Sequence, residues 1–105
     1  FVGVNAGKAG TGNGSNNVAV GVSAMYNATY QRQSTAVGNF ALNMSTSGCC
    51  NTAVGRFALY NTTTGLNNTS LGTNAGCTLT TGSNIIALGY NAQPSSATVS
   101  NEITS

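Results

Sequence analysis

The chain has 105 residues, only 4% of them charged, and a formal net charge of +2 at pH 7. Because it has no His and a single carboxylate side chain, Glu102, neither a carboxylate pair nor a Ser-His-Asp triad can form within one chain; we predict no enzymatic activity and no cofactor. Lys8, Arg32 and Arg56 form no basic run, which argues against nucleic-acid binding, and no stretch approaches the roughly 20 apolar residues of a membrane helix, so we expect no membrane insertion.

One short motif recurs along the chain, and residues 51–59 (NTAVGRFAL) are its clearest copy. The motif glycines are Gly3, Gly21, Gly38, Gly55, Gly72 and Gly89. From Gly21 onward they are equally spaced, and only the first step, from Gly3 to Gly21, is longer, by a single residue. A constant period of this size is typical of stacked repeats. We therefore predict an all-β fold, a parallel β-roll or β-helix solenoid with 17-residue coils, over residues 1–92.

Each repeat is predicted to begin with a short strand that ends at the motif glycine. The residue directly before the glycine is always Val or Leu, in the column Val20, Val37, Val54, Leu71 and Leu88. The residue before that is always small, in the column Ala19, Ala36, Ala53, Ser70 and Ala87. Because neighbouring strand residues point to opposite faces, both faces of the strand look crowded, as in a parallel sheet. We predict that the Val and Leu column forms the structural core.

The second half of each repeat contains a recurrent Ala, followed by a Thr-rich turn that ends in Gly. Phe40 and Phe57 occupy the same position in consecutive repeats, so we expect their rings to stack in neighbouring coils. A column of threonines runs through these turns: Thr29, Thr46, Thr63 and Thr80. Their hydroxyls suggest ice binding as an alternative function. Tyrosines together with Arg32 and Arg56 suggest glycan binding, although scattered tyrosines on a solenoid more often serve packing.

The repeat pattern fails at Pro94. Because proline cannot donate to a strand ladder, residues 93–105 are predicted to form an extended exit segment that leads toward a C-terminal domain outside this sequence. We accordingly interpret the chain as one segment of a longer fibrous protein.

The three cysteines leave three alternatives open. A Cys50–Cys77 disulfide would join neighbouring coils if the Cα atoms lie within about 6 Å, and a bond between the adjacent Cys49 and Cys50 is a second arrangement. The third is that the cysteines are small buried hydrophobic residues. Three Cys without His do not make a closed zinc site, so no metal site is predicted.

Six Asn-x-Ser/Thr sequons occur in the chain, which is only slightly more than its composition produces by chance. Asn27, Asn43 and Asn61 lie in or beside the predicted outer turns and are the candidate N-glycosylation sites if the host is eukaryotic. In a bacterial phage they would be ordinary surface asparagines.

Two family resemblances rest on these residues. The repeated Thr-Ala-Val-Gly-x-Phe-Ala-Leu unit is similar to the repeats in the heads of trimeric autotransporter adhesins, which implies parallel β-rolls packed three to a bundle. The repeats together with residues 88–104 (LGYNAQPSSATVSNEIT) resemble viral and phage tail-fibre proteins, in which this stretch precedes a self-cleaving chaperone domain of the endosialidase type. The chaperone's catalytic residues are not in this sequence, so the resemblance implies no protease activity.

The resemblance implies a homotrimer that serves as the shaft of a viral or phage tail fibre and supports host-cell attachment. The expected location is the virion surface or the extracellular space. The expected partners are neighbouring fibre segments and, through another region, a host receptor or glycan. The alternative is a trimeric bacterial adhesin or other extracellular filament subunit, which a downstream membrane anchor would favour over a downstream chaperone domain.

Overall fold

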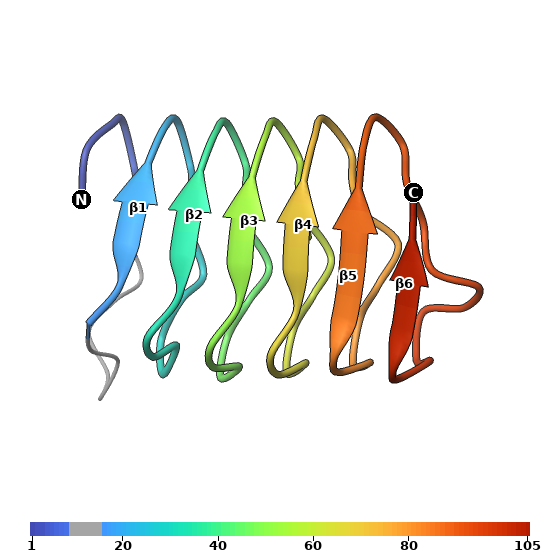
Figure 1. The fold of residues 1–105 in the computed structure, drawn as a ribbon. Helices are drawn as coiled ribbons and strands as arrows, with labels where there is room; N and C mark the ends of the chain where they lie inside the picture. Colours follow the sequence, from blue (N-terminus) through green and yellow to red (C-terminus); the bar gives the residue numbers. More distant parts are fainter. Residues whose placement is uncertain (9–15) are drawn as a thin grey trace.

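The computed structural model describes residues 1–8 and 16–105, which wind into a stack of coils with one parallel strand in each (Figure 1). The strands are β1 (Val18–Val20), β2 (Thr35–Val37), β3 (Thr52–Val54), β4 (Thr69–Leu71), β5 (Ile85–Leu88) and β6 (Glu102–Thr104). They form one sheet in sequence order, and no helix occurs among the described residues. The predicted all-β parallel solenoid with 17-residue coils is therefore confirmed.

Every strand pairs with the next at a shift of one full repeat, so equivalent residues lie directly above one another. Val18 pairs with Thr35, Thr35 with Thr52 and Thr52 with Thr69. The same shift aligns Ile85 with Glu102 and so places β6 in the sheet. The structure thus differs from the predicted extended exit segment over residues 93–105, because the chain returns to the stack after Pro94.

A protruding loop precedes β6 and absorbs the interruption at Pro94 (Figure 1). Glu102 closes this loop, since its carboxylate accepts hydrogen bonds from the Ser95 backbone N–H at 2.6 Å and the Ser95 hydroxyl at 2.7 Å. Thr104 also donates its hydroxyl to the Gln93 carbonyl at 3.0 Å. Side-chain contacts thus hold the loop, while Ser100 and Asn101 bond to Ser83 and Asn84 and keep the 17-residue register.

The interior of each coil is narrow, and the small residue at the middle of each strand faces it. Ala19, Ala36, Ala53, Ser70 and Ala87 are all buried. The prediction that Val20, Val37, Val54, Leu71 and Leu88 form the structural core is wrong for the single chain. Val20, Leu71 and Leu88 are 36%, 53% and 44% exposed, and the other two are half-buried. Side chains alternate along a strand, so the residues on either side of the buried middle one point away from the interior.

Larger buried side chains enter the interior from the turns that follow the glycine. Met25, Leu42 and Leu59 are fully buried at equivalent positions of three coils. The next equivalent residue is Gly76, where an added Cβ would lie 2.8 Å from Leu59 Cδ2. In that same coil the large buried side chains are instead Leu79 and Ile85. The large buried side chains therefore come from different positions in different coils, and the interior of each of these coils still holds at least one.

A polar ladder runs along the interior beside the start of the strands. Asn51 Oδ1 accepts the Asn68 backbone N–H at 2.9 Å, and Asn68 Oδ1 accepts the Ile85 N–H at 3.0 Å. The Nδ2 groups donate to carbonyl oxygens within the same two coils, from Asn51 to Gly65 at 2.9 Å and from Asn68 to Gly82 at 3.0 Å. Among the described residues no buried side-chain nitrogen or oxygen lacks a partner, so this ladder is fully satisfied.

The motif glycines form the tightest contact between coils. Gly55 has a φ of +135°, and an added Cβ would lie 2.5 Å from the Gly72 carbonyl oxygen in the next coil. Gly89 has a φ of +109°, but nothing lies within 4 Å of its added Cβ. Every motif glycine thus has a backbone conformation suited to glycine. In all of them except Gly89, the glycine backbone also stacks directly on the next coil.

Alanine substitution at these two glycines separates backbone strain from coil contact. We expect Gly89→Ala to cost about 1–3 kcal/mol of unfolding free energy from strain alone. Gly55→Ala adds a clash with backbone, so it should cost at least about 2 kcal/mol more or prevent folding. Urea unfolding followed by circular dichroism measures both, and equal losses would contradict the stacking argument.

The polar ladder is tested by Asn68→Ala. This change leaves the Ile85 N–H and the Gly82 carbonyl buried without partners, so we expect a loss of about 2–4 kcal/mol in unfolding free energy. The control is Asn61→Ala, at an exposed residue whose Nδ2 donates one hydrogen bond to the Cys77 carbonyl at 2.8 Å. That variant should lose about 1 kcal/mol or less in the same urea titration.

Candidate functional site

The face of the sheet that points away from the interior carries the most distinctive surface of the described chain. Two columns of side chains, here called the outward face, flank each buried Ala or Ser. The outward face consists of Val18, Thr35, Thr52, Thr69, Ile86 and Ile103 in one column and Val20, Val37, Val54, Leu71 and Leu88 in the other. No residue of this face is charged. It therefore forms an uncharged surface that crosses all six strands.

Exposure of this face is unusual for a parallel sheet. Such sheets are normally covered on both sides, and contiguous exposed apolar patches mark interaction sites. Ile103 is 76% exposed, and Val18, Ile86 and Leu88 are exposed as well. The columns lie about 4.8 Å apart from strand to strand, which gives a regular ladder rather than an irregular patch. We regard the outward face as the candidate functional site.

The composition of the outward face changes along the stack. β1 presents Val18 and Val20, whereas β5 presents Ile86 and Leu88. Between them the first column holds threonines, and the second changes from Val54 to Leu71. Side-chain volume in the second column therefore increases toward β5, while the middle of the first column adds a ladder of hydroxyls.

The aromatic side chains pack on the turns that follow the motif glycine. Phe40 and Phe57 stack with ring centroids 5.1 Å apart, which confirms the predicted stacking between coils. Tyr60 meets Phe57 edge-on at 5.2 Å, and the Arg56 guanidinium lies 4.6 Å from the Phe57 ring centroid. Arg56 and Tyr60 therefore belong to this aromatic cluster, which accounts for two of the residues considered for glycan binding.

The threonine column considered for ice binding does not form a flat array of free hydroxyls. Thr29 donates its hydroxyl to the Asn27 carbonyl at 3.3 Å, and Thr80 donates to the Ala97 carbonyl at 3.1 Å. Thr46 is exposed, whereas Thr63 is half-buried. A more regular threonine ladder lies in the outward face, where Thr35, Thr52 and Thr69 are in register.

The cysteines adopt the second of the predicted arrangements. Cys49 and Cys50 form a disulfide between adjacent residues, and Cys77 is free and half-buried. The predicted Cys50–Cys77 bond is therefore wrong. Cys50 precedes a strand and Cys77 follows a glycine bend, so the two residues occupy different parts of the coil. Sequence spacing alone could not place the two thiols relative to each other.

The three candidate glycosylation sites have different environments. Asn43 is 7% exposed, and its Nδ2 donates to the Ser23 carbonyl at 2.9 Å, so the prediction of a glycan at this residue is contradicted. Asn27 is half-buried and donates to the Asn43 carbonyl at 3.0 Å. Asn61 is exposed, which keeps it as the most accessible of the three. Glycosylation at Asn27 and Asn61 stays a prediction.

Chemistry-bearing clusters are scarce in residues 1–8 and 16–105. No group of three or more His, Cys, Asp or Glu side chains there could hold a metal ion. No helix in the described ranges is long and apolar enough to cross a membrane.

Comparison of the chain with protein-family models, curated proteins and solved structures finds no match. The geometry of the outward face is therefore the basis for a functional proposal.

The cysteine arrangement is tested by alkylation and mass spectrometry. The native protein unfolded without reductant should take up one alkyl group, on Cys77, and three after reduction. Peptide mapping should place Cys49 and Cys50 in one oxidised peptide. A Cys50–Cys77 cross-link in the unreduced map would contradict the observed arrangement.

Proposed function

We propose that the chain is a structural shaft segment of a trimeric viral or phage tail fibre that supports host-cell attachment at the virion surface. The observation that carries this proposal is the outward face, which is mainly apolar, uncharged and continuous over the stack. The resemblance of the repeats and of residues 88–104 to tail-fibre proteins supports the same function.

Three copies side by side would cover this face. Because successive coils repeat at about 4.8 Å in every copy, parallel copies in register bring each coil level with the same coil of its neighbours. Contacts made at Val54 would then recur at Leu71 and Leu88. Burial of apolar surface contributes about 25 cal/mol per Å², so a repeated contact accumulates along the shaft. The sheet would gain a second covered face, as parallel sheets normally have.

The coil geometry suits a mechanical role. Backbone hydrogen bonds join each coil to the next at the strands and also at the turns, for example from the Leu42 N–H to the Ala58 carbonyl at 3.0 Å. The buried asparagine ladder adds side-chain bonds in the same direction. Stacked coils of this kind bind only their neighbours, and a rod of any length can be assembled from them.

A trimeric bacterial adhesin or another extracellular filament subunit is the alternative with the same architecture. A third function, ice binding by a single solenoid, is favoured by one observation: Thr35, Thr52 and Thr69 lie in register on the uncharged outward face. The oligomeric state separates this last function from the first two, because a trimer would cover those hydroxyls.

The proposal predicts a trimer in solution. Sedimentation equilibrium of residues 1–105 should give three times the 10.5 kDa chain mass. Leu71→Asn puts an amide into the covered face of each chain, so it should weaken the trimer by about 2 kcal/mol or more per chain. The control Leu66→Asn changes a residue that is 42% exposed but outside the outward face, and it should leave the trimer intact.

A folded monomer at about 0.1 mM protein would contradict the shaft proposal, since micromolar association is already modest for a permanent assembly. Thermal hysteresis of such a monomer, lost in Thr52→Leu, would then support ice binding. A trimer followed in the full-length protein by a membrane anchor would identify the adhesin alternative.

A further inference from the structure

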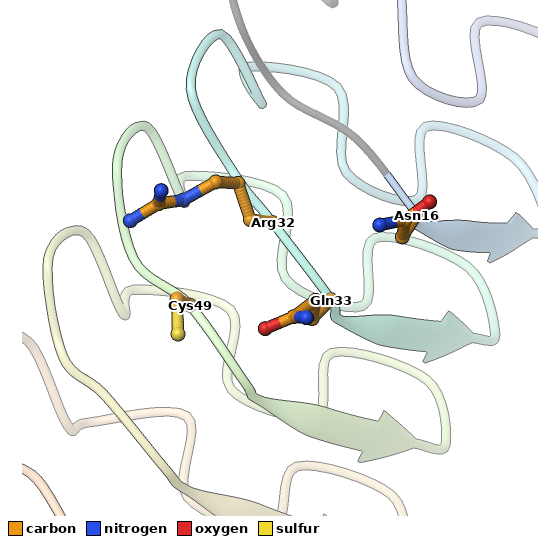
Figure 2. A pocket seen from close by; sticks show the side chains of 4 residues that line it. All are labelled: Asn16, Arg32, Gln33 and Cys49. Atoms are coloured by element: carbon orange, nitrogen blue, oxygen red, sulfur yellow. The ribbon is translucent and has the colours of Figure 1, made fainter.

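A hollow of about 310 Å³ lies at the corner of the coil, ahead of the strands, and is lined by Asn16, Arg32, Gln33 and Cys49 (Figure 2). These side chains come from three successive coils and surround an open space. None of them belongs to the outward face. The hollow is therefore separate from the surface proposed to hold the trimer together.

The residue type at this corner departs from the pattern of the other coils, although the backbone conformation is the same in all of them. Asn occupies the left-handed position before the strand in four coils, at Asn16, Asn67, Asn84 and Asn101. Gln33 and Cys50 occupy the same position with φ of 51° and 63°. Asn tolerates this conformation better than Gln or Cys does. Both residues lie at the hollow or beside it. Positive φ also recurs at Leu42 and Leu59 in the buried turns, so it is the side chains at this corner, and not the backbone conformation, that distinguish the hollow.

One wall of the hollow is formed by Cys49, which belongs to the disulfide with Cys50. Gln33 Oε1 lies 3.7 Å from Cys50 Sγ. Because a disulfide sulfur carries no proton, this is a packing contact rather than a hydrogen bond. The wall is thus apolar and polarisable, and the Gln33 amide lies against it.

Arg32 supplies an uncompensated positive charge. Its side chain is exposed, and the only carboxylate side chain of the sequence, Glu102, is engaged by Ser95 in the last coil. No ion pair involves Arg32 among the described residues. A guanidinium presents a planar fork of N–H donors that matches a carboxylate with two parallel hydrogen bonds. The primary amides of Asn16 and Gln33 are suited to hydroxyl groups, because each can donate and accept.

We propose that this hollow binds a sugar acid, a single hydroxylated ring that carries a carboxylate. Arg32 pairs with the carboxylate, the amides of Asn16 and Gln33 bond to ring hydroxyls, and the apolar face of the ring packs on Cys49. The volume is at the lower end of the roughly 300–1,000 Å³ of small-molecule sites, which suits one ring. Because the hollow offers a single cation and is open to solvent, we expect weak binding, with a dissociation constant on the order of 1 mM per chain, the weak end of the affinity scale.

The test is a titration of the 15N-labelled protein, followed by amide chemical shifts, with three probes: glucuronate, glucose and acetate. Glucose keeps the ring without the carboxylate, and acetate keeps the carboxylate without the ring. We expect saturable shifts at Asn16, Gln33 and Cys49 with glucuronate, and binding at least about tenfold weaker with either of the others, since each loses roughly one of the two recognised groups.

Charge-matched variants complete the test. Arg32→Gln should weaken glucuronate binding at least about tenfold, the scale of a lost charge-assisted hydrogen bond, and Arg32→Lys should weaken it less. Arg56→Gln removes the same charge at the aromatic cluster and should leave binding unchanged. Equal binding of acetate, equal loss in Arg56→Gln, or absence of shifts at the hollow would each overturn the inference. The amide spectrum shows whether the chain is folded, and sedimentation gives its oligomeric state separately. A loss of sugar-acid binding is therefore distinguishable from a failure to trimerise.

Discussion

Direct contact between glycine backbones sets the geometry of the whole molecule. Each bend can approach the next only where no Cβ intervenes, and Gly38, Gly55 and Gly72 provide this contact in consecutive coils. A side chain at any one of them would separate the two coils locally, and the strand pairing on one side and the turn pairing on the other would both lengthen. The strands on one side of the bend keep the same register from coil to coil, as a fixed bend requires.

A coil this narrow cannot contain a conventional hydrophobic core. Its interior holds alanines, a few leucines and a ladder of asparagines, and much of the larger apolar surface lies on the outside. Hydrogen bonds between coils fix the order of the stack, but each contributes only a modest net stabilisation. Few large side chains are buried inside to add to it. The outward face therefore contains the apolar area that the interior cannot accommodate, which is the physical reason to expect a neighbouring molecule there.

The repeat made the architecture predictable, but it did not predict which side chains face the interior. The constant period and the alternation within each strand correctly indicated stacked parallel strands. Alternation does not reveal which strand face is inside, however, so the prediction that the larger column forms the core is wrong for the single chain. The uniform smallness at Ala36 and Ala53 was the informative signal, because it measures the space available inside the coil. The return of the chain at β6 had a signal in the sequence, because Ser100 and Asn101 repeat Ser83 and Asn84 one period later, but the motif glycine and its flanking Val or Leu are missing there. By contrast, the hollow at Arg32 combines side chains from three coils, and no local pattern joins them.

The increase in side-chain volume from Val20 to Leu88 has a geometric consequence for the proposed bundle. If three copies meet along this column, their axes must stand farther apart at β5 than at β1, because leucine extends farther from the backbone than valine. Such a bundle would taper toward its N-terminal end. Successive segments of a fibre built on this plan would then match only when their radii agree at the junction, so the order of the segments would be encoded in the width of each end.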